Sequence, residues 1–134
     1  MSAIRILLVD DDADTRRLFG MALKALGEVV PASSGAEALE HLRREIFDLV
    51  VLDLHMPNVD GYAVLEALAE PSSVNKGTPV IVATADSTAE ARAQALKRRS
   101  VYFLSKPVPL RVLSELVSET LAKSASRVSR SIKP

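Results

Sequence analysis

The chain has 134 residues, almost half of them apolar, which is enough to bury the core of one domain. Seventeen basic residues balance seventeen acidic ones, so the chain lacks the broad positive charge typical of proteins that bind nucleic acids or membrane surfaces. The absence of cysteine excludes disulfide bonds and thiolate metal sites, and it is compatible with a reducing cytoplasm.

The first apolar run predicts a strand over residues 4–9, and three aspartates follow it directly. This run is too short for a signal peptide or a membrane span, so we expect a cytoplasmic protein. Apolar side chains at helical spacing then predict a helix over residues 13–26 that stops at Gly27. Its predicted buried stripe is Leu18, Met21, Ala22, Ala25 and Leu26.

A second strand over residues 28–32 contains Pro31, which cannot donate a hydrogen bond to a neighbouring strand. We therefore place this strand at an edge of its sheet. The helix that follows has a clear start, because Ser34 and Glu37 form a capping box, and it ends near residue 45.

Two continuous aliphatic runs predict strands over residues 48–53 and 79–84, and such runs are typical of parallel strands covered on both faces. The helix between them covers residues 62–70 and must end before Pro71. A fourth helix over residues 88–98 and a fifth strand over residues 101–105 follow.

The last helix begins at Pro109, a residue that suits a first helical turn. Its apolar stripe closes the domain and consists of Leu110, Leu113, Leu116, Val117 and Leu121. Residues 124–134 are rich in serine and basic residues and lack such a stripe. We therefore expect one domain over residues 1–123, followed by a basic tail or linker.

This alternation predicts an α/β fold with a doubly wound, five-stranded parallel sheet and helices on both faces. The flavodoxin-like order 2-1-3-4-5 places the strand that contains Pro31 at an edge, and we adopt it. In such sheets, ligands bind beyond the carboxyl ends of the strands, where the strand order reverses.

Five polar residues follow or end the predicted strands at that edge: Asp10, Asp11, Asp53, Thr84 and Lys106. Three carboxylates this close repel one another unless a cation binds between them, and Mg²⁺ prefers such oxygen ligands. An oxygen of Asp53 could then attack a phosphorus atom, while Lys106 and Thr84 contact the phosphoryl oxygens.

Each of these residues also has an ordinary structural explanation when it is considered alone. The aspartates after the first strand could simply cap a helix, Thr84 could be a strand end, and Lys106-Pro107 could be a loop. Their joint occurrence at the ends of successive predicted strands favours the functional interpretation.

Over residues 3 to 123 the sequence resembles the receiver domain of bacterial two-component response regulators. The matching motifs, in chain order, are Leu8-Val9-Asp10-Asp11-Asp12, the loop from Asp53 to Gly61, Thr84-Ala85 and Lys106-Pro107. Two positions depart from the common pattern: Phe103 lacks the hydroxyl of the usual tyrosine, and Arg99 stands where a glycine often ends the fourth helix.

The resemblance implies that Asp11 and Asp53 bind Mg²⁺ directly, Asp10 acts largely through water, and His55 contributes its backbone carbonyl. Mn²⁺ could substitute for Mg²⁺. Asp53 would accept a phosphoryl group from a phosphohistidine of a sensor histidine kinase or phosphotransfer protein. It would later lose the group by hydrolysis, at a rate tuned by His55 and Asp86. Such a domain is a regulatory phosphoacceptor with self-catalysed uptake and loss, rather than an enzyme with a separate substrate.

By the same resemblance, Thr84 and Phe103 would move inward on phosphorylation, and Lys106 would pair with the phosphoryl group. This would remodel the face made by the fourth helix, fifth strand and fifth helix. Through that face the domain could meet an effector protein, an output domain or a second copy of itself. We expect no direct contact with nucleic acid or membrane.

Two other functions remain open from the sequence. Asp12-Ala13-Asp14-Thr15 fits the nucleophile motif of haloacid-dehalogenase-type phosphatases, which also use an aspartyl phosphate. A receiver-like module that binds partners without carrying phosphate is the second alternative. The position of a phosphate label on Asp12, on Asp53 or on neither distinguishes these functions.

Overall fold

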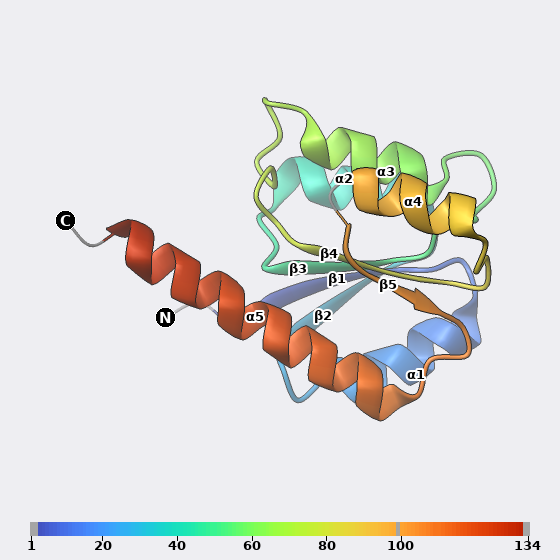
Figure 1. Cartoon of the computed structure of the whole chain (residues 1–134), viewed down its shortest axis with the longest axis horizontal. Helices are drawn as coiled ribbons and strands as arrows, with labels where there is room; N and C mark the ends of the chain where they lie inside the picture. The colour runs from blue at the N-terminus through green and yellow to red at the C-terminus, as the bar shows by residue number, and fades with distance from the viewer. Residues whose placement is uncertain (1–2, 99, 133–134) are drawn as a thin grey trace.

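The computed structural model describes residues 3–98 and 100–132, in which five parallel strands form one sheet (Figure 1). The strand order is β2-β1-β3-β4-β5, as predicted. The strands are β1 (Arg5–Val9), β2 (Glu28–Ala32), β3 (Leu49–Leu52), β4 (Val80–Thr84) and β5 (Ser100–Ser105). Arg99 lies outside the described residues.

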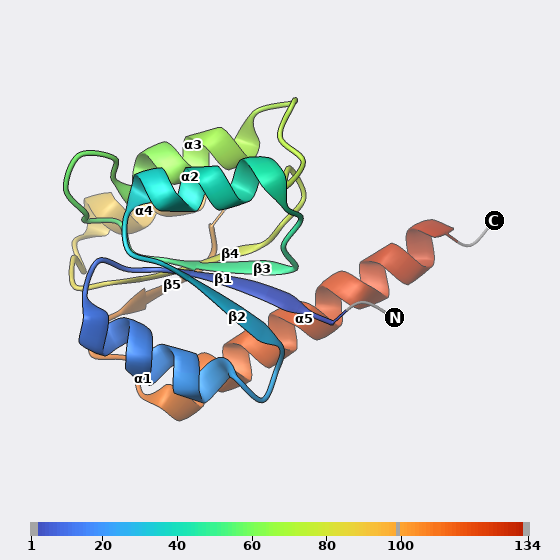
Figure 2. The same ribbon diagram turned by 180° about the vertical axis from the view of Figure 1, so that it is seen from behind.

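Helices cover both faces of the sheet, with α2, α3 and α4 on one face and α1 and α5 on the other (Figures 1 and 2). They are α1 (Ala13–Leu23), α2 (Gly35–Arg44), α3 (Gly61–Ala69), α4 (Ala89–Lys97) and α5 (Leu110–Ile132). The doubly wound α/β architecture expected from the sequence is therefore confirmed.

Alternate residues of each central strand enter two separate apolar clusters, because successive side chains of a strand point to opposite faces. In β1, Leu7 and Val9 belong to the cluster under α2, α3 and α4, whereas Ile6 and Leu8 belong to the cluster under α1 and α5. β3 and β4 are buried along their whole length. This explains why these strands are continuous aliphatic runs in the sequence.

Pro31 lies in the edge strand β2, and its missing N–H costs the sheet no hydrogen bond. The N–H of Glu28 donates to the Ile4 carbonyl, and the carbonyl of Ala32 accepts from Asp10. Because alternate residues of a strand face the same neighbour, residues 28, 30 and 32 face β1 and Pro31 faces away from it.

The prediction for the first helix was wrong at its end and for three residues of its stripe, one of which, Ala25, is exposed beyond the end of the helix. α1 ends at Leu23, three residues early, and its buried side chains are Phe19 and Leu23. Leu18 and Met21 are 43% and 67% exposed. At about 100° per residue, they lie roughly 100° and 200° around the helix axis from Phe19, which faces the sheet.

α5 continues to Ile132, so the backbone stays helical beyond residue 123, where the sequence analysis expects a basic tail or linker. Residues 122–132 contain neither proline nor glycine, and no residue there breaks a helix. Leu113 and Val117 are fully buried, and the C-terminal turns project beyond the sheet (Figure 1). Among the described residues, no helix is both long and apolar enough to cross a membrane.

The amino-terminal side of β3 is held by the buried side chain of Asn75, which is 1% exposed. Its amide nitrogen donates to the carbonyls of Leu42 and Glu45, both at 2.8 Å. Its amide oxygen accepts from the N–H of Phe47 at 2.8 Å and from the hydroxyl of Thr78 at 3.1 Å. One side chain thus joins the end of α2 to the loops that precede β3 and β4.

Replacing Asn75 by alanine should lower the free energy of unfolding by about 3 kcal/mol, because several buried polar groups lose their partner together. Urea denaturation followed by circular dichroism measures the change. The exposed neighbour Ser72 provides the control, since Ser72→Ala should cost less than about 0.5 kcal/mol. Equal effects of the two substitutions would contradict the role given to Asn75.

Candidate functional site

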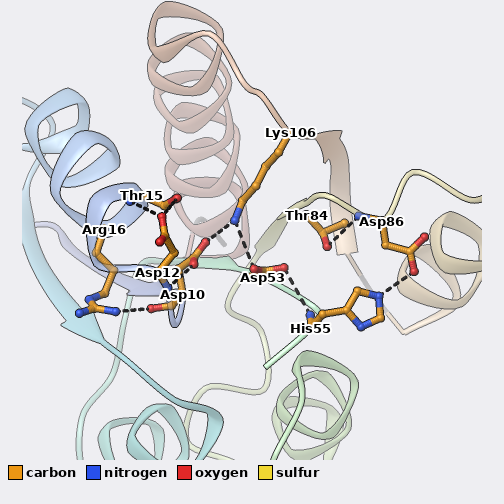
Figure 3. A network of polar contacts seen from close by, with 9 residues as sticks. All are labelled: Asp10, Asp12, Thr15, Arg16, Asp53, His55, Thr84, Asp86 and Lys106. Carbon is orange, nitrogen blue, oxygen red and sulfur yellow. Dashed lines mark hydrogen bonds and ion pairs between the residues drawn. The ribbon is translucent and has the colours of Figure 1, made fainter. Parts of the chain in front are cut away.

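Three strands end in the charged residues that the sequence analysis brought together, and Figure 3 shows them side by side. Asp10 directly follows β1 and donates its N–H to the Ala32 carbonyl at 3.1 Å. Asp53 directly follows β3 and donates its N–H to the Val9 carbonyl at 3.0 Å. Sheet hydrogen bonds therefore fix both carboxylates at the carboxyl edge of the sheet.

Lys106 follows β5, where its N–H donates to the Thr84 carbonyl at 2.8 Å. Its ammonium donates to Asp10 Oδ2 at 2.6 Å and to Asp53 Oδ2 at 3.2 Å. The side chains of Asp10 and Asp53 are only 3% and 9% exposed. One cation thus bridges two nearly buried carboxylates.

Burial and charge act against each other in this cluster. Burial raises the pKa of Asp10, although the hydrogen bonds from Lys106 and from the Asp12 N–H oppose the rise. Burial alone would lower the pKa of Lys106, but the hydrogen bond to Asp10 and the charges of Asp10 and Asp53 raise it overall. Lys106 therefore stays protonated at neutral pH, and the remaining negative charge of the cluster favours a second cation.

Asp10, Asp11 and Asp53 form the cluster that fits a metal ion, since one carboxylate oxygen from each lies within 4.8 Å of the others. Asp11 is exposed, whereas the other two are buried. Three hard oxygen donors with one side open to solvent suit Mg²⁺, which keeps several of its waters. The residues present therefore fit the predicted ion.

The loop after β3 starts α3 directly against the backbone of Asp53 and Leu54. Asp60 caps the helix by accepting from the Ala63 N–H at 3.0 Å, and the Gly61 N–H donates to the Leu54 carbonyl at 2.8 Å. A Cβ on Gly61 would lie 2.6 Å from Leu54 Cα, so a side chain there would displace the strand end. Gly61 therefore allows α3 to pack close to Asp53.

His55 and Asp86, expected separately from the resemblance, form a hydrogen bond with 2.7 Å between Nε2 and Oδ2 (Figure 3). The hydrogen bond from His55, with two from Thr88, lowers the pKa of Asp86 to about 2. The His55 N–H also donates to Asp53 Oδ1 at 3.3 Å. The pair joins the loops after β3 and β4 beside Asp53, and the role predicted for the His55 carbonyl stays a prediction.

The two predicted switch residues are both buried. Thr84 is fully buried, and its hydroxyl accepts from the Asp86 N–H at 3.3 Å. Phe103 is 8% exposed, and its ring packs in the cluster under α4, with the Arg92 guanidinium 5.9 Å from the ring centroid. The aromatic ring predicted to move inward thus already lies inside.

The loop between β1 and α1 contains two interactions, and only the first could be expected from the sequence. Asp12 is the helix cap, and its carboxylate accepts from the N–H and hydroxyl of Thr15 at 2.9 and 2.6 Å. Arg16 Nη1 donates to the Asp10 carbonyl at 2.7 Å, a contact that the sequence analysis missed. No sequence signal distinguishes Arg16 from any other basic residue of an exposed helix.

Comparison with known proteins gives one consistent result. The sequence model of the response regulator receiver domain matches residues 6–118. The transcriptional regulatory protein GlrR of Escherichia coli is 40% identical over 121 residues, which are 90% of this chain and 27% of GlrR. The chain thus spans about a quarter of the length of this relative.

Solved receiver structures share the fold. A CheY-like receiver domain protein of Methanospirillum hungatei has a TM-score of 0.87 and 28% identity, covering 94% of this chain and 99% of its own. The BeF3-activated receiver domain of DrrB, a Thermotoga maritima protein, has a TM-score of 0.82 and 26% identity, covering 90% and 99%.

The carboxylate cluster predicts a response to metal. Millimolar MgCl₂ should raise the melting temperature, because a ligand at a hundred times its Kd stabilises the folded state by about 2.7 kcal/mol. Asp11→Asn should lose most of this increase in a thermal melt. Asp14→Asn is the matched control, since the Asp14 side chain is 83% exposed on α1 and pairs with Arg17. NaCl of equal ionic strength corrects for screening. An unchanged response of Asp11→Asn would contradict the assignment.

Proposed function

The chain belongs to the response regulator receiver domain family, whose members are phosphorylation-activated switches of two-component systems, and we propose that Asp53 is its phosphoacceptor. The contact that carries the proposal is the bridge from Lys106 to Asp10 and Asp53. It holds the carboxylate of Asp53, the proposed nucleophile, beside the ammonium of Lys106 at the carboxyl edge of the sheet.

In the proposed reaction the donor is a phosphohistidine on a sensor histidine kinase or phosphotransfer protein. A carboxylate oxygen of Asp53 forms a bond to phosphorus while the phosphorus–nitrogen bond breaks. The bonding electron pair returns to the imidazole of the donor, so charge and atoms balance. Hydrolysis of the acyl phosphate later restores the carboxylate. The domain thus catalyses its own modification and remains a regulatory protein.

Each site residue would take a distinct part in this reaction. Asp11, Asp53 and the His55 carbonyl would hold Mg²⁺, with Asp10 acting largely through water, and Mn²⁺ could replace it. When bound, the cation would neutralise the negative charge that gathers on the phosphoryl oxygens. Lys106 supplies a second positive charge, and the hydroxyl of Thr84 donates a hydrogen bond. Residues 1–123 would make up this domain, acting in the cytoplasm.

The output of the switch would pass through the face formed by α4, β5 and α5. Phe103 lies in β5 and packs beneath α4, so a change at Thr84 would reach this face through the neighbouring strand. The partner that responds to this change could be an effector protein, an output domain or a second copy of the chain. GlrR is a transcriptional regulator, which favours a response that ends in gene expression.

The phosphatase alternative has less support. Its candidate nucleophile, Asp12, is the cap of α1, and the side-chain hydrogen bond from Thr15 lowers the pKa of its carboxyl group. A carboxylate held in this way is fixed as a helix cap rather than directed at a substrate. The second alternative, a module that never carries phosphate, predicts no modification of any aspartate.

Exposure to acetyl phosphate and Mg²⁺ should add one phosphoryl group to the protein, as measured by intact mass spectrometry. Asp53→Asn should abolish the addition, because an amide oxygen is a far weaker nucleophile. Asp12→Asn serves as the control and should be modified like the unaltered protein. Phosphate on Asp12 would favour the phosphatase, and no modification of the unaltered protein would defeat the switch.

The pair between His55 and Asp86 should lengthen the life of the phosphoryl group, because it occupies space beside Asp53 where water would approach. His55→Ala and Asp86→Ala should each speed the decay several-fold, measured by loss of label after the donor is removed. The double substitution should add little, since both residues act through one contact. Glu90→Ala, an exposed change on α4, is the control. Additive effects would show that the residues act separately.

A further inference from the structure

Arg16 lies one helical turn beyond the cap of α1, and its side chain points back toward the carboxyl edge of the sheet. Its N–H donates to the Asp12 carbonyl at 3.0 Å, while its Nη1 donates to the Asp10 carbonyl at 2.7 Å (Figure 3). Side chains of a helix lean toward its N-terminus, so this reach needs no distortion. The guanidinium therefore joins α1 to the end of β1.

The Asp10 carbonyl lies where β1 loses its neighbour. The paired register of β1 and β2 ends at Val9 and Ala32, and β2 then gives way to α2 at Gly35. Because the Asp10 N–H donates to Ala32, the carbonyl of the same residue points toward the side that β2 has left. Arg16 supplies the donor that a longer β2 would have provided.

With this contact, every polar group of Asp10 is bonded. Its N–H donates to Ala32 and its carbonyl accepts from Arg16. Its Oδ1 accepts from the Asp12 N–H at 2.9 Å, and its Oδ2 accepts from Lys106. The peptide between Asp10 and Asp11 starts at the carbonyl that Arg16 holds, so Arg16 restrains the direction in which Asp11 leaves the sheet.

We infer that Arg16 is a positioning residue for the cation site, which it supports by holding the Asp10–Asp11 peptide and so directing the exposed Asp11 carboxylate toward Asp53. The inference rests on the proposed cation site. It assigns to Arg16 no contact with the phosphoryl group. Partners in the outer shell of a metal site commonly change its affinity by about 10-fold or more when they are removed.

A positioning role and a purely electrostatic role for Arg16 predict opposite changes in Mg²⁺ affinity when the residue is replaced. A positive charge near three carboxylates opposes the binding of a second cation. If Arg16 acted only through its charge, its removal would tighten the binding of Mg²⁺. If it acts by holding the peptide, its removal should weaken the binding despite the loss of a repelling charge. The sign of the change therefore separates the two roles.

Arg17 is the matched control, because it is the next residue of the same helix but faces solvent. Its side chain is 67% exposed and lies 3.7 Å from Asp14 in an exposed pair. Arg17→Gln removes the same charge from the same helical turn and leaves the Asp10 carbonyl bonded. It should leave the affinity for Mg²⁺ unchanged or slightly raised.

The experiment is a calorimetric titration of the whole chain with MgCl₂ at constant ionic strength. We expect about a 10-fold rise in the Kd for Arg16→Gln and none for Arg17→Gln. Arg16→Lys keeps the charge and one donor, so it should restore part of the affinity. A thermal melt of each variant in EDTA shows whether it folds. At saturating MgCl₂, uptake from acetyl phosphate by Arg16→Gln should approach that of the unaltered protein.

Each outcome has a defined meaning. Binding by Arg16→Gln that equals or exceeds that of the unaltered protein would overturn the inference and leave the proposed phosphoacceptor intact. Equal weakening by Arg16→Gln and Arg17→Gln would also overturn it. If Arg16→Gln does not fold, the Mg²⁺ affinity of Arg16→Lys tests the inference instead. An affinity equal to that of the unaltered protein would show that the guanidinium is not required and would overturn the inference. If the unaltered protein bound no Mg²⁺, the cation site and the inference would fail together.

Discussion

The ammonium group of Lys106 lies between the carboxylates of Asp10 and Asp53, and this contact sets the character of the whole carboxyl edge of the sheet. A single positive charge offsets only one of the two buried negative charges, and Asp11 adds a third negative charge beside them. The folded protein therefore tolerates this cluster, which still favours the binding of a further cation. Nearby contacts, including the cap at Asp12 and the pair of His55 with Asp86, hold the surrounding loops in place.

Most of the fold could be predicted from the sequence, because the positions of the strands depend on local patterns of residue type. Continuous aliphatic runs marked the buried strands, and Pro31 alone was enough to place β2 at an edge. The stripe of α1 failed at Leu18 and Met21, since several apolar residues compete there and only packing selects Phe19 and Leu23. α5 extends into the segment expected to be a tail, because serine and basic residues weaken a helical pattern without breaking it.

The charged residues of the candidate site were predictable for a geometric reason: parallel strands deliver the residues at their carboxyl ends to one edge. Asp10, Asp53 and Lys106 needed no further information. The contact of Arg16 with a backbone carbonyl, and the buried position of Phe103, depend on side-chain directions across elements that are distant in the chain. Such contacts leave no local pattern, so they became visible only in the folded structure.

Pro31 also bears on how copies of this protein can meet. An open edge strand offers unpaired N–H and carbonyl groups to which another strand can add, and uncontrolled addition leads to aggregation. On β2 the outward-facing position at residue 31 has no hydrogen to offer, and Arg5 pairs with Glu28 at the start of the strand. The sheet therefore resists growth at this edge, whereas β5, at the opposite edge, belongs to the face proposed for regulated association between molecules.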